Sequence, residues 1–196
     1  MPRQPRRSSA ETREHVLCVA GDLFYREGIR ATGVDKIAAD AGVAPTTLYR
    51  LFPSKDELVA AYTERAAELR RRAITDVVAA DGRPAGERIL ALFEVLSAEV
   101  APAAPECRGC TFLMVLTELP DDSLAAHRHA VAMKRWIRDT VRTLTAELPD
   151  EPNPDALADQ LVLILDGYTA SAQALGPGGP AAQARPLVER LLALGA

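Results

Sequence analysis

Four neighbouring side chains could hydrogen-bond to nucleic acid. Thr46, Thr47, Tyr49 and Arg50 place three hydroxyl groups and one guanidinium group within a very short stretch of chain. Such groups donate to phosphate oxygens and base edges in DNA, and the methyl group of a threonine can contact the methyl group of thymine. These residues can read a DNA sequence only if one helix presents them on the same face. Whether they bind DNA therefore depends on the elements that surround them.

Residues 32–55 have the pattern of two short helices joined by a tight turn. The first helix is predicted over residues 33–41, with Thr32 as its N-cap and Asp35 completing an approximate capping box. Gly42 ends this helix, because glycine readily adopts the left-handed conformation that a sharp exit from a helix requires. The pattern is that of a helix-turn-helix.

The second helix is predicted to run from Pro45 to Phe52, since proline suits the first position of a helix. Leu48 and Phe52 lie one turn apart and would anchor it inward. The side chains left on the outer side are Thr46, Thr47, Tyr49 and Arg50. The N-terminal part of a recognition helix enters the major groove with such residues. The short pattern I-A-x-x-A-G-V alone also fits two solvated helices of an ordinary bundle.

A longer pattern joins these helices to their neighbours. F-x-x-x-G spans Phe24–Gly28, A-G-V-x-x-x-x-L-Y spans Ala41–Tyr49, and F-x-S-K-x-x-L spans Phe52–Leu58. The three pieces stand in register, and over residues 10–70 the chain resembles the TetR family of transcriptional regulators. The resemblance implies a homodimer whose N-terminal head binds double-stranded operator DNA and whose helical body binds a small-molecule effector. Repression is the usual mode of this family.

By the resemblance, Thr32 and Lys55 contact DNA phosphates, and both lie at predicted helix N-termini, where backbone N–H groups attract anions. A solvated side chain is the alternative for Lys55. The predicted DNA-binding residues are Thr32, Pro45, Thr46, Thr47, Tyr49, Arg50 and Lys55. Two positions depart from the family pattern. Ala44 replaces the usual Ser or Thr, which removes a side-chain N-cap, and Arg50 replaces the frequent His or Lys. Arg can pair bidentately with guanine, so the operator sequence of relatives cannot be transferred.

The fold is predicted to be all-α, with about nine helices in two domains. Residues 10–70 would form the helix-turn-helix DNA-binding domain, and residues 71–196 an effector-binding and dimerisation domain. The other predicted helices cover residues 12–27, 53–80, 85–100, 110–119, 123–148, 155–175 and 181–194. Residues 1–10 are polar and Arg-rich and predict a disordered arm, which could enter a minor groove or serve only solubility.

Apolar residues between positions 93 and 168 could line an effector pocket. Taken singly, each is expected to be ordinary core, and the pocket itself is implied by the resemblance. The candidates are Phe93, Leu96, Phe112, Leu116, Met133, Trp136, Leu165 and Tyr168. No cluster of charges accompanies them, so the effector is expected to be small and largely apolar.

The last two helices are more apolar than one buried face requires. Leu161–Leu165 is an uninterrupted apolar run. A helix that is apolar nearly all round must be buried on two sides, inside its own domain and against a partner. This predicts a homodimer formed through the last two helices of each copy.

The cysteines leave a second chemistry open. Cys107 and Cys110 form a C-x-x-C at a predicted helix start, which fits a redox switch, half of a zinc site, or a structural segment. No second C-x-x-C follows, and the nearest downstream histidines are His127 and His129, so no metal and no cofactor are predicted. Cys18 is predicted to be core.

Composition and charge argue against several other classes of protein. The net charge is −4, yet residues 1–55 carry nine Lys and Arg against six Asp and Glu, a balance of +3. A basic head on an acidic body suits a sequence-reading regulator better than a protein that coats DNA through many phosphate contacts. An all-helical enzyme is the other alternative, but the sequence has no paired His and Glu ligands, nucleophile motif or glycine-rich phosphate loop. No apolar run reaches the length of a membrane span and no signal peptide is evident, which predicts a cytoplasmic protein without membrane contact.

Overall fold

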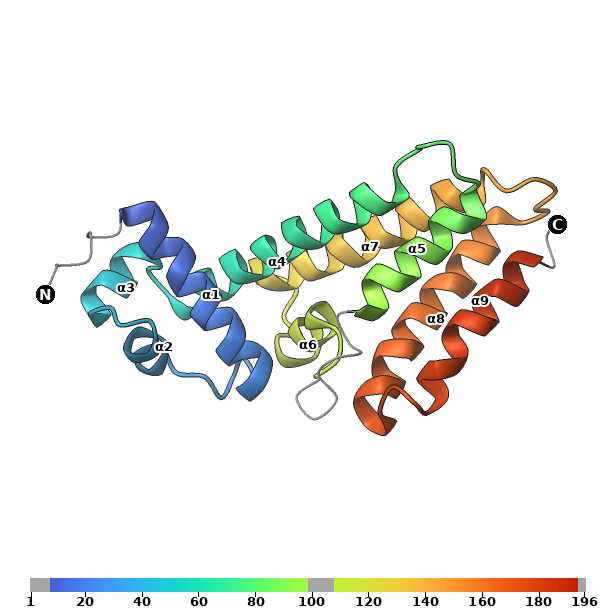
Figure 1. The fold of residues 1–196 in the computed structure, drawn as a ribbon. Helices are drawn as coiled ribbons and strands as arrows, with labels where there is room; N and C mark the ends of the chain where they lie inside the picture. Colours follow the sequence, from blue (N-terminus) through green and yellow to red (C-terminus); the bar gives the residue numbers. More distant parts are fainter. Residues whose placement is uncertain (1–7, 99–107, 194–196) are drawn as a thin grey trace, which may run out of the picture. The chain divides into compact units, whose positions relative to one another are not determined.

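The computed structural model describes residues 8–98 and 108–193, and within these ranges it contains nine α-helices, one short 3-10 helix and no strand (Figure 1). This confirms the all-α prediction. The elements are α1 Ser9–Glu27, α2 Val34–Asp40, α3 Pro45–Leu51, α4 Lys55–Val78, α5 Ala85–Ala98, α6 Thr111–Glu118, α7 Ala125–Thr145, α8 Pro154–Leu175, the 3-10 helix η1 Pro180–Gln183, and α9 Ala184–Ala193.

Helix α1 begins earlier than the sequence predicts. The Oγ atom of Ser8 accepts a hydrogen bond from the Glu11 N–H at 3.2 Å, and the Glu11 carboxylate accepts one from the Ser8 N–H at 2.7 Å. This reciprocal capping box satisfies two N–H groups that a helix end otherwise leaves without partners. Residues 8–10 are therefore ordered, and the predicted arm is wrong for them. The arm's other seven residues lie outside the described residues.

The chain folds as two compact units, each described below by itself. The N-terminal unit contains the described residues up to Ala66 together with Val115–Ala130, and the C-terminal unit contains the rest. Helices α4, α6 and α7 each pass from one unit to the other. The predicted division at residue 70 had assigned the segment 115–130 to the C-terminal domain, whereas it packs with the N-terminal unit.

The N-terminal unit is built on aromatic packing beneath the helix-turn-helix. Helix α1 packs on α2, and α2 packs on α3. The ring of Phe24 on α1 meets the ring of Tyr62 on α4 edge to face, with centroids 5.5 Å apart. Gly21 makes this approach possible, because a Cβ atom at that position would lie 2.9 Å from Cε2 of Tyr62. The small residue thus fixes how closely α4 can sit on α1.

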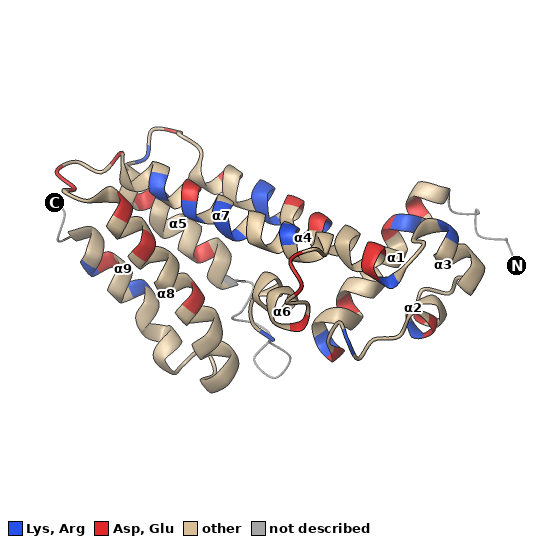
Figure 2. Cartoon of the chain, turned by 180° about the vertical axis from the view of Figure 1, so that it is seen from behind, with Lys and Arg blue, Asp and Glu red and all other residues tan. Residues whose placement is uncertain are grey.

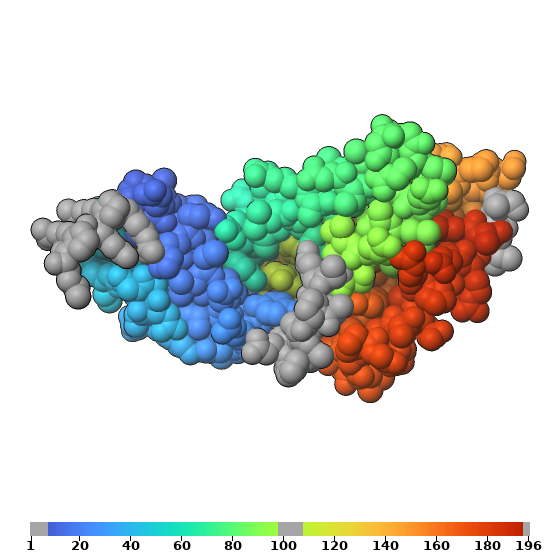
Figure 3. Space-filling model, in the orientation of Figure 1, coloured from blue at the N-terminus to red at the C-terminus, as the bar shows by residue number. Residues whose placement is uncertain are grey.

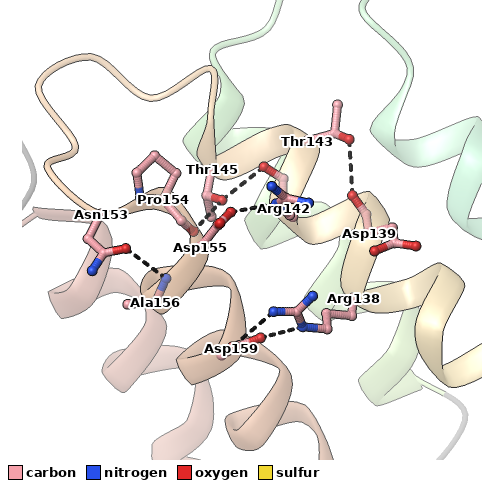
Figure 4. A network of polar contacts seen from close by, with 10 residues as sticks. All are labelled: Arg138, Asp139, Arg142, Thr143, Thr145, Asn153, Pro154, Asp155, Ala156 and Asp159. Atoms are coloured by element: carbon pink, nitrogen blue, oxygen red, sulfur yellow. Dashed lines mark hydrogen bonds and ion pairs between the residues drawn. The ribbon is translucent and has the colours of Figure 1, made fainter.

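The C-terminal unit joins its helices by apolar packing and by ion pairs. Helices α5, α8 and α9 pack on one another. Figure 2 marks the basic and acidic residues along these helices. Basic residues on α7 pair with acidic residues on α8, and Figure 4 shows two of these pairs. The pairs are Lys134 with Asp166, Arg138 with Asp159, and Arg142 with Asp155. The hydrogen bond from Arg138 holds the pKa of Asp159 below its usual value. Two of these pairs are exposed and Lys134–Asp166 is half-buried, and all three join two long antiparallel helices.

The connection from α7 to α8 is closed by polar contacts (Figure 4). The buried hydroxyl of Thr145 donates to the Pro154 carbonyl at 2.8 Å. Asn153 caps α8 by accepting a hydrogen bond from the Ala156 N–H at 3.2 Å. No described helix is long and apolar enough to cross a membrane.

Candidate nucleic-acid interface

A tight turn sets the position of α3. Gly42 has a φ of +64°, a left-handed conformation that side chains disfavour. Its N–H donates to the Ala39 carbonyl and the Val43 N–H donates to the Ala38 carbonyl, both at 3.0 Å, so the end of α2 is satisfied within the turn. Helix α3 then starts at Pro45, and its N-cap residue Ala44 makes no side-chain cap, as the sequence predicts.

Helix α3 has one buried and one exposed face. Leu48 and Phe52 are 1% and 2% exposed and anchor the helix and its C-cap in the core. Tyr49 is 46% exposed although it is a large aromatic residue. Pro45, Thr46 and Arg50 are also exposed, and Thr47 is half-buried. The helix therefore presents hydroxyl groups and a cation on a surface held by two apolar anchors. That these groups bind DNA stays a prediction.

A polar hollow of about 400 Å³ lies beside this surface. It is lined by Ser9, Thr12, Ala41, Gly42, Val43, Ala44, Thr47, Arg50 and Leu51. The hollow thus combines the first turn of α1 with the α2–α3 turn and three residues of α3. A helix N-terminus attracts anions, and at α1 the Glu11 carboxylate already accepts a hydrogen bond from the Ser8 N–H. Ser9 and Thr12 are not among the predicted DNA-binding residues, although the S-x-x-E pattern at residues 8–11 marks the start of α1.

Thr32 does not fit its predicted roles. The N-cap of α2 is Gly33, which makes no side-chain cap, so the predicted capping by Thr32 is wrong. Its side chain is fully buried and its hydroxyl donates to the Gly28 carbonyl at 2.7 Å. A buried hydroxyl already bonded to backbone cannot reach a phosphate, so Thr32 stabilises the α1–α2 connection instead.

Lys55 lies at the start of α4. It is half-buried, and its Nζ donates to the Arg30 carbonyl at 3.3 Å. The preceding Ser54 caps the helix, since its Oγ accepts a hydrogen bond from the Glu57 N–H at 3.1 Å. The ammonium group is thus held near a helix N-terminus, where a phosphate would also be attracted.

Known proteins share both the motif and the fold. The family model described as bacterial regulatory proteins of the tetR family matches residues 16–62. SCO4454, a TetR-family transcriptional regulator from Streptomyces coelicolor, is 32% identical, with a TM-score of 0.86 over 95% of this chain and 96% of that chain. The chain belongs to the TetR family. It is a transcriptional regulator with a helix-turn-helix domain.

Two further relatives support this assignment over most of the chain. The uncharacterized HTH-type transcriptional regulator Rv1255c from Mycobacterium tuberculosis is 30% identical over 85% of this chain and 92% of that protein. The HTH-type transcriptional repressor BdcR from Escherichia coli is 26% identical over 88% of this chain and 83% of that protein. The similarity therefore extends well beyond the DNA-binding motif.

The effector pocket predicted for this TetR-family chain is only partly assembled in the C-terminal unit. Five of the eight candidates are buried, namely Phe93, Leu96, Phe112, Met133 and Leu165. Trp136 and Tyr168 are half-buried, and Leu116 belongs to the N-terminal unit. A pocket of about 220 Å³ lies between α5, α8, η1 and α9, and of the candidates only Phe93 and Tyr168 line it. The other six do not contribute to this pocket.

Cys18, Cys110 and His127 lie within the described residues, whereas Cys107 does not. Cys110 is a half-buried residue whose carbonyl accepts from the Met114 N–H at the start of α6. Cys18 is exposed, so its assignment to the core is wrong. Its Sγ atom accepts a hydrogen bond from the Nη2 atom of Arg65 at 3.9 Å. His127 donates through Nδ1 to the Leu119 carbonyl at 2.8 Å. Among the described residues, no three His, Cys, Asp or Glu side chains cluster as a metal site.

Proposed function

We propose that this TetR-family regulator is a ligand-responsive repressor that binds a palindromic operator as a homodimer in the cytoplasm. The observation that carries the DNA-binding part is the outer face of α3, where Thr46, Tyr49 and Arg50 are exposed around two buried anchors. Repression is supported by the name of one relative, the transcriptional repressor BdcR. Pro45, Thr47 and Lys55 complete the proposed interface, with Ser9 as a phosphate contact.

Homodimerisation through α8 and α9 rests on exposed leucines. Leu163 and Leu175 on α8 are 70% and 67% exposed, and Leu187 on α9 is also exposed. These two helices lie side by side on the surface of the C-terminal unit (Figure 3). A partner subunit that covered these two helices would remove the exposed leucines from water. A dimer also supplies two recognition helices, which a palindrome with half-sites about 34–36 Å apart requires.

The effector is proposed to be small and largely apolar. Support comes from the apolar residues predicted for the pocket, of which Phe93 and Tyr168 line the hollow between α5, α8 and α9. A volume of about 220 Å³ suits a small molecule rather than a chain-like lipid. Arg185 at this pocket forms ion pairs with both Glu94 and Glu189, so its positive charge is already compensated by neighbouring carboxylates.

The test is selection of duplex DNA from a random pool by the full-length protein, followed by titration of the selected duplex. We expect a palindromic sequence bound at least about a thousandfold more tightly than scrambled DNA, and one dimer per duplex by light scattering. Equal affinity for both duplexes would identify a DNA-coating protein. A monomer that binds one half-site would contradict the dimer.

A further inference from the structure

One residue of the α1–α2 loop is bound by the end of α6. The backbone N–H of Arg30 donates to the Glu118 carboxylate at 2.8 Å, and the Arg30 Nε donates to the Glu118 carbonyl at 2.6 Å. Glu118 is the last residue of α6, where carbonyl groups lack partners within the helix and carry partial negative charge. A guanidinium group is suited to this position, so Arg30 caps a helix that lies 88 residues further along the chain.

The same residue also contacts the start of α4. The Arg30 carbonyl accepts the hydrogen bond from Lys55 Nζ at 3.3 Å. Arg30 is therefore bonded on one side to the end of α6 and on the other to a proposed phosphate-binding ammonium group. A shift of the Arg30 peptide would move the loop that leads into α2 and remove a hydrogen-bond acceptor from Lys55.

The end of α6 is held from a second direction. His127, on α7, donates to the carbonyl of Leu119, the residue after Glu118. The first half of α6, residues 111–114, belongs to the C-terminal unit, while Val115–Glu118 belongs to the N-terminal unit. A helix of eight residues moves largely as one piece, so a displacement at its start is felt at Glu118.

We propose that Arg30 and Glu118 are positioning residues for DNA binding, which couple the position of α6 to the α1–α2 loop and Lys55. This inference rests on the proposed function. Coupling between two sites is reciprocal. DNA bound at the head must therefore stabilise the end of α6, and loss of the Arg30–Glu118 contact must abolish that effect without removing the recognition surface on α3.

The test is hydrogen exchange of the full-length protein with and without the duplex selected above. In the wild type we expect DNA to slow exchange both in α3 and in residues 115–119, the latter by about two- to tenfold, the scale of one hydrogen bond. Arg30→Ala removes the hydrogen bond from Nε, and Glu118→Ala removes the one to the carboxylate. In both variants the slowing in α3 persists and the slowing in residues 115–119 is reduced, and in the double variant the slowing in residues 115–119 disappears. Glu118→Gln keeps a side-chain oxygen that can accept the hydrogen bond from the Arg30 N–H, so in this variant DNA should again slow exchange in residues 115–119.

The matched control is Arg142→Ala, which removes an exposed ion pair of similar length between α7 and α8. It should leave both effects of DNA unchanged. An undiminished effect at residues 115–119 in Arg30→Ala, or none in the wild type despite protection of α3, would overturn the coupling. Absence of protection in α3 itself would instead refute the proposed function.

Discussion

The proposed DNA-binding surface depends on one short segment of the chain, whereas the proposed effector site depends on several distant segments. The outer face of α3 depends on a few positions in one short segment, in which Gly42 sets the turn and Leu48 and Phe52 set the orientation. The apolar residues proposed for the effector come from four separate helices, and only two of the eight line the observed pocket. A site built on one helix follows from its sequence spacing, whereas a site built between helices depends on their packing.

The largest expected effect comes from the dimer surface, on which two-headed recognition depends. Leu163→Glu places a charge on a side chain that is 70% exposed, so the fold of the subunit should survive. We expect monomers in light scattering and a loss of operator affinity of at least about a hundredfold, because each head then binds its half-site alone.

Leu69→Glu is the matched control, since Leu69 on α4 is 50% exposed and lies outside α8 and α9. It should remain dimeric and bind DNA normally. A dimeric Leu163→Glu protein would place the interface on another surface and remove this part of the account.

Tyr49→Ala separates recognition from folding. Tyr49 is 46% exposed, so the melting temperature should stay within a few degrees while specific affinity falls about tenfold or more. The double variant Thr46→Ala/Thr47→Ala should behave alike. Leu48→Ala, one position away but buried, should instead lower the melting temperature strongly. Equal melting temperatures for Leu48→Ala and Tyr49→Ala would mean that the faces of α3 are assigned incorrectly.

Gly21→Ala tests the packing that supports the recognition helix. The added methyl group would lie 2.9 Å from the Tyr62 ring, which itself packs against Phe24. Displacement of the ring should cost about 1–2 kcal/mol in the free energy of unfolding, measured by urea denaturation. Gly86→Ala, where the nearest side-chain atom would be 3.9 Å away, should be neutral or slightly stabilising. A stabilised Gly21→Ala protein would show that α1 and α4 are not in close contact.

Lys55→Ala should weaken binding to all DNA sequences about equally. Loss of one phosphate contact reduces the slope of log affinity against log salt concentration by about 1. The titrations are made over a range of salt concentrations with selected and scrambled duplexes. An unchanged slope combined with altered preference at one base would show that Lys55 reads sequence.

The smallest effect concerns the Arg138–Asp159 pair. Arg138 lowers the pKa of Asp159 in the folded state, so the pair stabilises the fold above the ordinary aspartate pKa and its contribution is lost as the pH falls through the lowered value. Arg138→Ala should therefore lower the melting temperature slightly at neutral pH and not at all in strong acid. A difference that persists at the lowest pH would assign the effect to packing of the arginine stem.

The sequence predicted the helix-turn-helix well because its determinants are local. Gly42, Pro45 and the spacing of Leu48 and Phe52 depend on backbone geometry and helical periodicity, which are visible in a short window. Thr32 was misassigned because capping residues and buried hydroxyls that bond to backbone share the same residue type. Cys18 was misassigned because its residue type and its place in a helix do not say whether another element covers it.

Contacts between segments that are far apart in the chain could not be predicted from the sequence in this way. Nothing in the sequence pairs Arg30 with Glu118, or assigns residues 115–130 to the N-terminal unit, because both depend on how distant segments pack. The same reason explains why only two of the eight predicted residues line the pocket. Apolar spacing predicts a buried face but does not show whether that face encloses a cavity.

The spacing of half-sites tests the central claim most directly, namely that α3 of each subunit reads one half of a palindrome. Operator affinity is measured for the selected duplex and for versions with about 5 or about 10 base pairs inserted at its centre, half a turn and one full turn of DNA. The account predicts that the half-turn insertion reduces affinity to that of a single half-site, because the second recognition helix then faces the wrong side of the duplex. Equal affinity for the original and half-turn duplexes would contradict it.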